Sequence, residues 1–247
     1  TKGVCRVYLG AMKKVRRSQE RGHANHGWLN SFHTFSFADY HDEKHMGFRS
    51  LRVINEDRVA AGQGFGTHGH RDMEILSYVL RGELAHKDSM GNGSTLRPGD
   101  IQRMTAGTGV RHSEFNGSSS ELVHFLQIWI MPEKQGLIPS YEERHIPATE
   151  RRGVLRKVAS RSGDGGAVVV HQDLTLWVGN FQGDESSVFT VDAARYVWVH
   201  LASGELTVTT SEGEDRLHAG DAIGFSDVTE FRLTEGVDAE VLLFDLA

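Results

Sequence analysis

Short apolar runs, rich in β-branched and aromatic residues, recur along the chain with turn residues between them. These runs are Leu51–Ile54, Ile75–Leu80, Leu122–Met131, Ala167–His171, Tyr196–Leu201, Glu205–Thr210 and Glu240–Phe244. No segment carries the apolar spacing of a long amphipathic helix. Frequent short strands without helical periodicity predict an all-β sandwich or barrel, in which Gly82 and the Pro98-Gly99-Asp100 segment form the turns of a meander.

An internal repeat divides this pattern into two parts. The tripeptide Gly82-Glu83-Leu84 returns 122 residues later as Gly204-Glu205-Leu206, and Gly99-Asp100 returns 121 residues later as Gly220-Asp221. Two matches in nearly the same register predict two copies of one β-unit. Three prolines and a charged run lie between the copies. We therefore expect an N-terminal domain at 1–133, a linker at 134–147 and a C-terminal domain at 148–247.

Two polar doublets interrupt the strand-like sequence of the first copy. They are His68 with His70, and His112 with Glu114. Side chains at i and i+2 of a strand project from the same face, so each doublet points in one direction. Two such strands side by side supply three imidazoles and one carboxylate, a ligand set suited to Fe, Ni, Co, Mn, Cu or Zn. Glu74 is an alternative carboxylate.

The second copy lacks this set. At the same offsets, Thr190 and Asp192 stand in place of His68 and His70, and Tyr196 stands in place of Glu74. Leu233 and Glu235 take the positions of the second doublet. We expect no metal ion in the second copy, which then serves as a packing scaffold or as a wall of the pocket.

Composition narrows the class of protein. The 247 residues carry a formal net charge of −6, with 38% hydrophobic and 24% charged residues, as in a globular protein. This charge argues against general nucleic-acid binding, and we interpret the basic run at 13–17 as a solvated edge. No apolar run approaches a membrane span, and the first residues lack the apolar core of a signal peptide. Cys5 is the single cysteine, so an internal disulfide is excluded. We expect a cytoplasmic protein without nucleic-acid or membrane partners.

The order of the candidate residues resembles the two motifs of the cupin superfamily. The first motif is matched by Gly62, His68, His70 and Glu74, with Gly82 one residue late; the second is matched by Gly99, Gly107, His112 and Asn116. Thr105 replaces the proline of the second motif, and four residues rather than two separate Gly107 from His112. The segments 21–28, 32–37, 62–70 and 105–114 are similar to the bacterial pirin family, a resemblance that covers about residues 16 to 133 and continues more weakly to the C-terminus.

The resemblance implies a fold and a ligand set. The fold is a bicupin, all-β, with two tandem jelly-roll barrels of the double-stranded β-helix type. The generic cupin pattern selects Glu74 as the carboxylate ligand, whereas the pirin pattern selects Glu114, which we prefer beside His68, His70 and His112. Glu74 then orients a histidine. One divalent ion is expected, and Fe(II) is preferred to the other metals named above. No organic cofactor site is predicted.

The resemblance also implies an activity. Bacterial pirins are associated with quercetin 2,3-dioxygenase activity, an oxidoreductase reaction that cleaves a flavonol heterocycle with O₂ and releases carbon monoxide. The substrate is then a phenolic or flavonol compound, and Glu114 is the catalytic base. One alternative is a non-enzymatic regulatory protein whose metal ion tunes a surface for a protein partner. Another is a sugar or polyol isomerase, which predicts a polar pocket in place of an aromatic one.

Further residues are candidates for the surroundings of the site. Phe65, Met73, Phe115, Phe125 and Trp129 are candidate apolar walls for a flat aromatic substrate, and Gly64, Gly66 and Gly69 leave room for a ligand near the backbone. The N-terminal histidines show no ligand spacing, and we interpret them as capping or packing residues. They are His23, His26, His33, His41 and His45.

Overall fold

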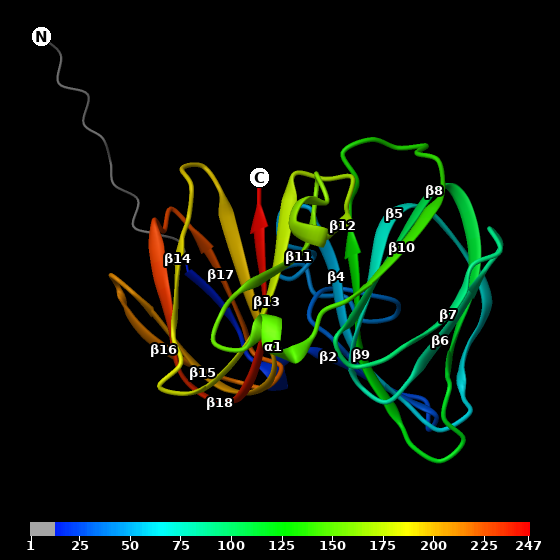
Figure 1. Ribbon diagram of the computed structural model, residues 1–247, viewed down its shortest axis with the longest axis horizontal. Coiled ribbons are helices and arrows are strands. Elements are labelled where there is room, and N and C mark those ends of the chain that lie inside the picture. Colours follow the sequence, from blue (N-terminus) through cyan, green and yellow to red (C-terminus); the bar gives the residue numbers. More distant parts are fainter. Residues whose placement is uncertain (1–12) are drawn as a thin grey trace, which may run out of the picture.

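Two nine-stranded, mainly antiparallel sheets, each curled on itself, lie side by side in the computed structural model, which describes residues 13–247 (Figure 1). Among these described residues, helical structure is limited to η1 (Ser18–Glu20), α1 (Ala148–Arg151) and η2 (Asp164–Gly166). Within the described range, none of the helices has the length and apolar character needed to cross a membrane. The predicted all-β class with two tandem barrels is confirmed, and Cys5 lies outside the described residues.

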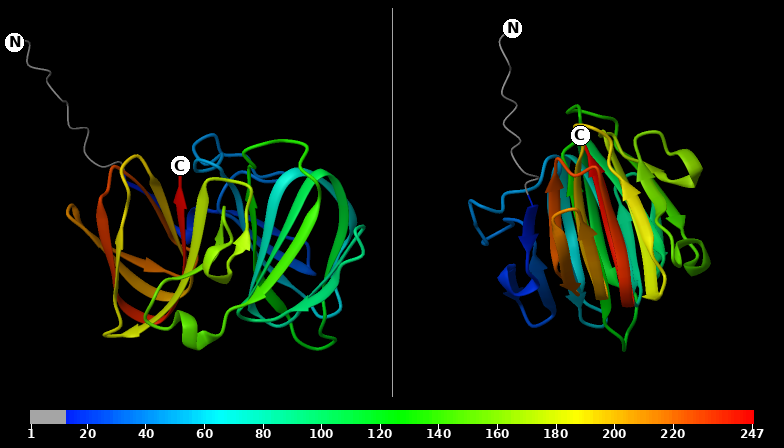
Figure 2. Two further views of the ribbon diagram at one scale, coloured as in Figure 1. Left: turned by 45° about the horizontal axis from the view of Figure 1, so that its top comes forward. Right: turned by 90° about the vertical axis from the view of Figure 1, so that its left-hand side faces the viewer.

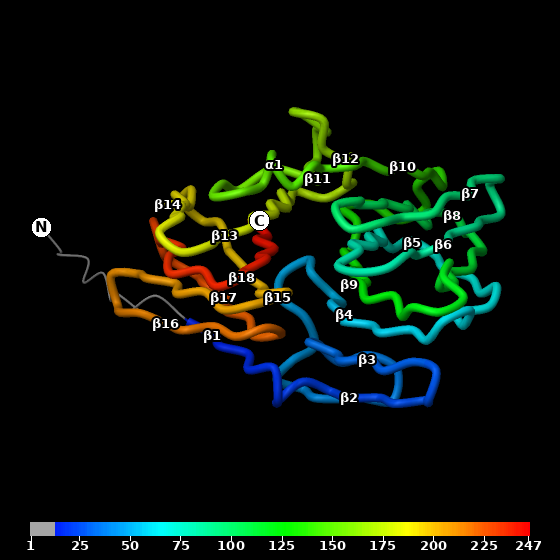
Figure 3. The backbone as a smooth tube through the Cα atoms, turned by 60° about the horizontal axis from the view of Figure 1, so that its bottom comes forward, coloured from blue at the N-terminus to red at the C-terminus, as the bar shows by residue number. Residues whose placement is uncertain are grey.

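The first sheet is built almost entirely from the N-terminal half of the chain. Its strand order is β2-β3-β4-β9-β5-β8-β6-β7, and β10 adds to the free side of β8. The strands are β2 (Gly22–Asn25), β3 (Leu29–His33), β4 (Leu51–Val59), β5 (Gly64–Arg81), β6 (Leu84–Asp88), β7 (Gly93–Leu96), β8 (Asp100–Asn116), β9 (Val123–Ile130) and β10 (Ser140–His145). In Figure 3, β2 and β3 lie on the outer side of β4.

The second sheet has the order β1-β17-β15-β18-β13-β11-β12, with β14 on β18 and β16 on β15. Its strands are β1 (Lys13–Arg16), β11 (Arg156–Ser160), β12 (Val168–Val169), β13 (Leu174–Gly183), β14 (Ser187–Thr190), β15 (Tyr196–Thr210), β16 (Gly213–His218), β17 (Ala222–Ser226) and β18 (Glu230–Leu246). Figure 2 shows the two curled sheets from two further sides.

The connection at Gly82 differs from the predicted meander. β5 and β6 follow each other in sequence, but β8 lies between them and pairs with both. The long strands β5 and β8 therefore cross the whole barrel, as jelly-roll strands do, and they carry both polar doublets.

Backbone angles support the internal repeat. Gly82 and Gly204 have positive φ angles of 80° and 73°, and Gly99 and Gly220 have φ angles of 91° and 85°. Each matched pair thus has the same left-handed conformation, which residues other than glycine rarely adopt. The repeated sequence marks equivalent turns of the two barrels.

Two strands depart from the proposed division: one joins the sheet of the other barrel, and one lies inside the proposed linker. β1 pairs with β17 of the second sheet, and its neighbour Arg17 forms a salt bridge of 2.8 Å with Asp221. β10 falls inside the proposed linker and pairs with β8 of the first sheet. Both strands tie the barrels together, and part of the basic run at 13–17 serves this junction.

A shared hydrophobic core joins the barrels. Its buried members come from both halves of the chain: Phe35, Leu76, Tyr78, Leu126 and Ile128 from the first, and Val158, Leu176, Trp198, Leu242 and Phe244 from the second. The ring of Trp198 lies 5.1 Å from the rings of both Phe35 and Phe48, measured between centroids. Burial of large side chains at this junction couples the stability of the two barrels.

We therefore expect Trp198→Ala to lower the free energy of unfolding by about 3–5 kcal/mol, because it removes a fully buried indole. Both barrels should still unfold in one transition. Urea denaturation followed by tryptophan fluorescence and by far-UV circular dichroism checks this. Two separated transitions in the wild-type protein would contradict the coupled core.

Candidate metal centre

The ladder between β5 and β8 brings the two polar doublets together. His68 lies directly opposite His112, and the register shifts between Phe65 and His68 and again between His70 and Asp72. The strands approach closely beside the site, because a Cβ on Gly64 would lie 2.3 Å from the carbonyl oxygen of Glu114. A glycine is therefore required at this position, whereas Gly66 faces open space.

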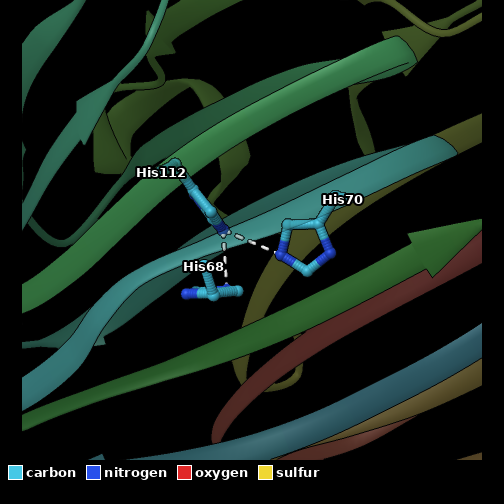
Figure 4. A group of neighbouring side chains, drawn as sticks. All are labelled: His68, His70 and His112. Atoms are coloured by element: carbon cyan, nitrogen blue, oxygen red, sulfur yellow. Dashed lines mark hydrogen bonds between the residues drawn. The ribbon is translucent and has the colours of Figure 1, made fainter.

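Three imidazoles converge in this ladder (Figure 4). Nε2 of His112 lies 2.9 Å from Nε2 of His70 and 3.1 Å from Nε2 of His68. Nδ1 of His68 lies 2.8 Å from the carbonyl oxygen of Gly66, which can only accept a hydrogen bond. His68 thus carries its proton on Nδ1 and turns the lone pair of Nε2 toward the other two rings.

Burial and neighbouring histidines keep the rings of His70 and His112 neutral. Burial, followed by the neighbouring His112 and His68, lowers the pKa of His70 to about 4. Burial and the neighbouring His68 likewise lower the pKa of His112 to about 3. At neutral pH both rings therefore offer lone pairs in place of positive charge, as metal ligands must.

The spacing of the rings fits an ion. With metal–nitrogen bonds of about 2.1 Å, adjacent ligands of an octahedron are about 3.0 Å apart and those of a tetrahedron about 3.4 Å apart. The separations of 2.9 and 3.1 Å match the octahedral case. Three nitrogen ligands would leave further positions of such an ion for a carboxylate and for substrate.

Glu114 stands beside this cluster, with both oxygens held by uncharged donors. The hydroxyl of Ser77 donates to Oε1 at 2.9 Å, and the amide of Gln127 donates to Oε2 at 2.7 Å. Glu114 forms a group of possible metal ligands with His86 and His112, separate from the group of His68, His70 and His112. His86 is a buried histidine that sequence reasoning missed. The structure thus brings together three of the four predicted ligands and places the fourth at the edge of the cluster.

Glu74 lies outside the histidine cluster. It is fully buried, and its Oε2 accepts a hydrogen bond from the backbone N–H of His171 at 3.1 Å. The same oxygen lies 3.2 Å from Nδ1 of the His171 ring. The histidine that Glu74 contacts therefore belongs to the second half of the chain, not to the cluster. This contact favours Glu114 over Glu74 as the carboxylate of the site.

A cavity of about 810 Å³ opens onto the cluster and is lined by His68, His70 and Glu114. Its aromatic walls are Trp28, Phe37, Phe65 and Trp129. Of the predicted wall residues, Phe65 and Trp129 are thus in place. Phe125 and Met73 pack into hydrophobic clusters instead, and Phe115 is exposed.

The N-terminal segment completes this cavity. His23, His26 and His33 line it, which differs from the packing role that we expected for them. The interpretation fits His45, whose ring contacts the carboxylate of Asp42 at 2.7 Å. Sequence reasoning also missed Asp57, an acidic residue in the mostly buried strand β4 that lines the cavity. Burial raises the pKa of Asp57 to about 7.

The second barrel is filled where the first is hollow. Its interior is a cluster of buried apolar side chains that includes Phe181, Val199, Phe231 and Leu233. Thr190 pairs with Glu230 and Leu233 pairs with Ser187, so the proposed counterparts Thr190 and Leu233 do not lie opposite each other as His68 and His112 do. In the described part of the chain, the groups of residues able to hold a metal lie in the first barrel. The second barrel is a packing scaffold, and the cavity is lined by the first half of the chain alone.

Fold and site together define a bicupin with a histidine cluster in one barrel and a solid core in the other. A family model described as Pirin matches residues 14–130, and one described as the quercetinase C-terminal cupin domain matches residues 157–246. The chain is 47% identical over 232 residues to a quercetin 2,3-dioxygenase of Escherichia coli strain K12, with 94% of this chain and 97% of that relative covered.

Solved structures agree with this match. The crystal structure of YhhW from Escherichia coli is 47% identical, with a TM-score of 0.89 and coverage of 96% of this chain and 98% of that chain. Bacterial pirin YhhW in complex with nickel(II) is 46% identical, with a TM-score of 0.88 and coverage of 95% and 99%. The chain belongs to the pirin family.

We expect His70→Ala to reduce bound metal from about one equivalent per chain to a small fraction of that, because it removes one of three converging imidazoles. Elemental analysis after nickel loading and desalting measures this. His41→Ala, which removes an exposed histidine outside the cluster, is the matched control and should keep the wild-type metal content. Near-stoichiometric nickel in the His70→Ala protein would exclude the cluster as the site.

Proposed function

We propose that this protein is a metal-dependent dioxygenase that acts on flavonol-like aromatic substrates, cleaving the heterocycle with O₂ and releasing carbon monoxide. The observation that carries the proposal is the cluster of three converging imidazoles beside an aromatic-walled cavity of about 810 Å³. The name of the Escherichia coli relative, quercetin 2,3-dioxygenase, supports the same activity.

We assign His68, His70, His112 and Glu114 as the ligands of one divalent ion. Fe(II) is the expected metal, and the nickel(II) in the related pirin structure is among the alternatives that this ligand set accepts. When bound, the ion supplies Lewis acidity toward a substrate oxygen. The hydrogen bond from His68 to Gly66 fixes the ring that faces the ion.

Glu114 also serves as the general base of the proposed mechanism. Its side chain borders the cavity, so a substrate hydroxyl near the cluster lies within its reach. Ser77 and Gln127 each donate to one of its oxygens and thereby fix its orientation. The proton of the flavonol 3-hydroxyl then passes to Glu114, and the electron-rich flavonolate that remains is the form that reacts with O₂.

The cavity walls favour this activity over the alternatives. The rings of Trp28, Phe37, Phe65 and Trp129 offer flat apolar surface, which suits an aromatic substrate and keeps water from the reacting atoms. A sugar or polyol isomerase would need polar walls instead. A purely regulatory surface for a protein partner would not require a cavity of this volume.

We expect nickel- or iron-loaded protein to consume O₂ with quercetin, and Glu114→Gln to lower kcat by about 10²–10⁴-fold, because an amide cannot accept the proton. Glu74→Gln should change kcat far less, since Glu74 contacts His171 rather than the cavity. O₂ uptake together with carbon monoxide detection measures both. A larger loss in Glu74→Gln would make Glu74 the ligand, and absence of turnover in the wild type would favour the regulatory alternative.

A further inference from the structure

A carboxylic acid that the proposed mechanism does not use faces the same cavity. Asp57 lies on β4, where its ladder neighbours are Ser31 on β3 and Phe125 on β9. Only 4% of its surface is exposed, and it lines the cavity with Glu114. Among residues 13–247, no lysine or arginine forms a salt bridge with Asp57, so burial of this acid is not offset by an opposite charge.

A short chain of hydrogen bonds ends on Asp57. The hydroxyl of Ser31 is hydrogen-bonded to Oδ1 of Asp57, and Nε2 of His33 lies 2.9 Å from the hydroxyl oxygen of Ser31. Ser31 donates its one hydroxyl proton to Asp57, so the hydroxyl oxygen accepts from Nε2 of His33. Both donors thus point toward the acid and hold it in one orientation.

The second carboxylate oxygen of Asp57 is available to a ligand. Oδ1 accepts from Ser31, whereas Oδ2 has no hydrogen-bond partner in the part of the chain that the structure describes. Oδ2 is not one of the fully enclosed unpaired atoms of the described residues, so it is accessible from the cavity, where a hydroxyl group of a bound molecule could act as its donor. The nearby carboxylate of Glu114 cannot be that donor in its ionised form, and burial already raises the pKa of Asp57.

We propose that Asp57, held by Ser31 and His33, binds a hydroxyl group of the aromatic substrate and forms a second polar anchor apart from the histidine cluster. This inference rests on the proposed function and names the substrate class more closely. The substrate carries at least two hydroxyl groups, one for the metal site and one for Asp57, on a flat ring system that fits between the aromatic walls. Asp57 is thus a residue that selects and positions the substrate.

Two flavonols distinguish binding through Asp57 from binding through the metal site. Quercetin carries several hydroxyl groups, whereas 3-hydroxyflavone carries only the one expected at the metal site. Their dissociation constants are measured by titration of nickel-loaded protein without O₂, so that binding is observed without turnover. We expect Asp57→Asn to weaken quercetin binding about tenfold or more, as for a lost hydrogen bond to a charged group, and to leave 3-hydroxyflavone binding unchanged.

The variants are chosen to separate binding from folding. Asp57→Asn keeps the shape of the side chain and an acceptor for Ser31. Ser31→Ala provides a second variant, which should weaken quercetin binding in the same direction because it releases the orientation of Asp57. Asp184→Asn is the matched control: it makes the same charge change at an exposed position in the second half of the chain, outside the cavity lining, and should bind both flavonols as the wild type does.

The outcomes distinguish this inference from the proposed function. A selective loss of quercetin affinity in Asp57→Asn and Ser31→Ala, with wild-type nickel content and melting temperature, supports the anchor. If the wild type turns over quercetin while both variants keep its preference for quercetin over 3-hydroxyflavone, the anchor is excluded and the dioxygenase remains. If the wild type neither binds nor turns over either flavonol, the proposed function is excluded and the anchor with it.

Discussion

The register of β5 against β8 is the constraint on which the site depends. It places His68 directly opposite His112 and brings His70 within 2.9 Å of the same ring. A slip of one residue would turn every side chain of one strand to the opposite face and scatter the cluster. The register is secured by the length of both strands, by the close approach at Gly64, and by buried residues at the other end of the ladder, such as Ile75 and Met104.

The two barrels differ in their interiors and in their contributions to the protein. In the described part of the chain, the cavity of about 810 Å³ lies in the first barrel and holds buried polar groups such as Asp57 and Glu114 that contribute little to stability. The second barrel is packed with apolar side chains, and it shares a core with the first around Trp198. β1 and β10 link the barrels further by pairing outside the expected boundaries. A stable scaffold can thus support a site whose polar groups are individually costly.

Local sequence signals predicted much of this structure. Alternation along a strand was enough to place His68 with His70, and the repeated Gly-Glu-Leu and Gly-Asp segments revealed two equivalent barrels. Features set by long-range pairing were not predictable in the same way. Nothing local shows that β1 joins the second sheet, that Glu74 meets His171, or that the segment before β4 closes the cavity. Asp57 was overlooked because its role depends on partners from another strand, Ser31 and His33.

The central claim is that His68, His70 and His112 hold one ion with Glu114 beside the cavity. It is tested most directly by a crystal structure of nickel-loaded protein with anomalous data at the nickel edge. The account predicts one anomalous peak per chain, within bonding distance of Nε2 of all three histidines and of a Glu114 oxygen. A peak held by His86, His112 and Glu114 without His68 and His70, or one at surface histidines, would contradict it.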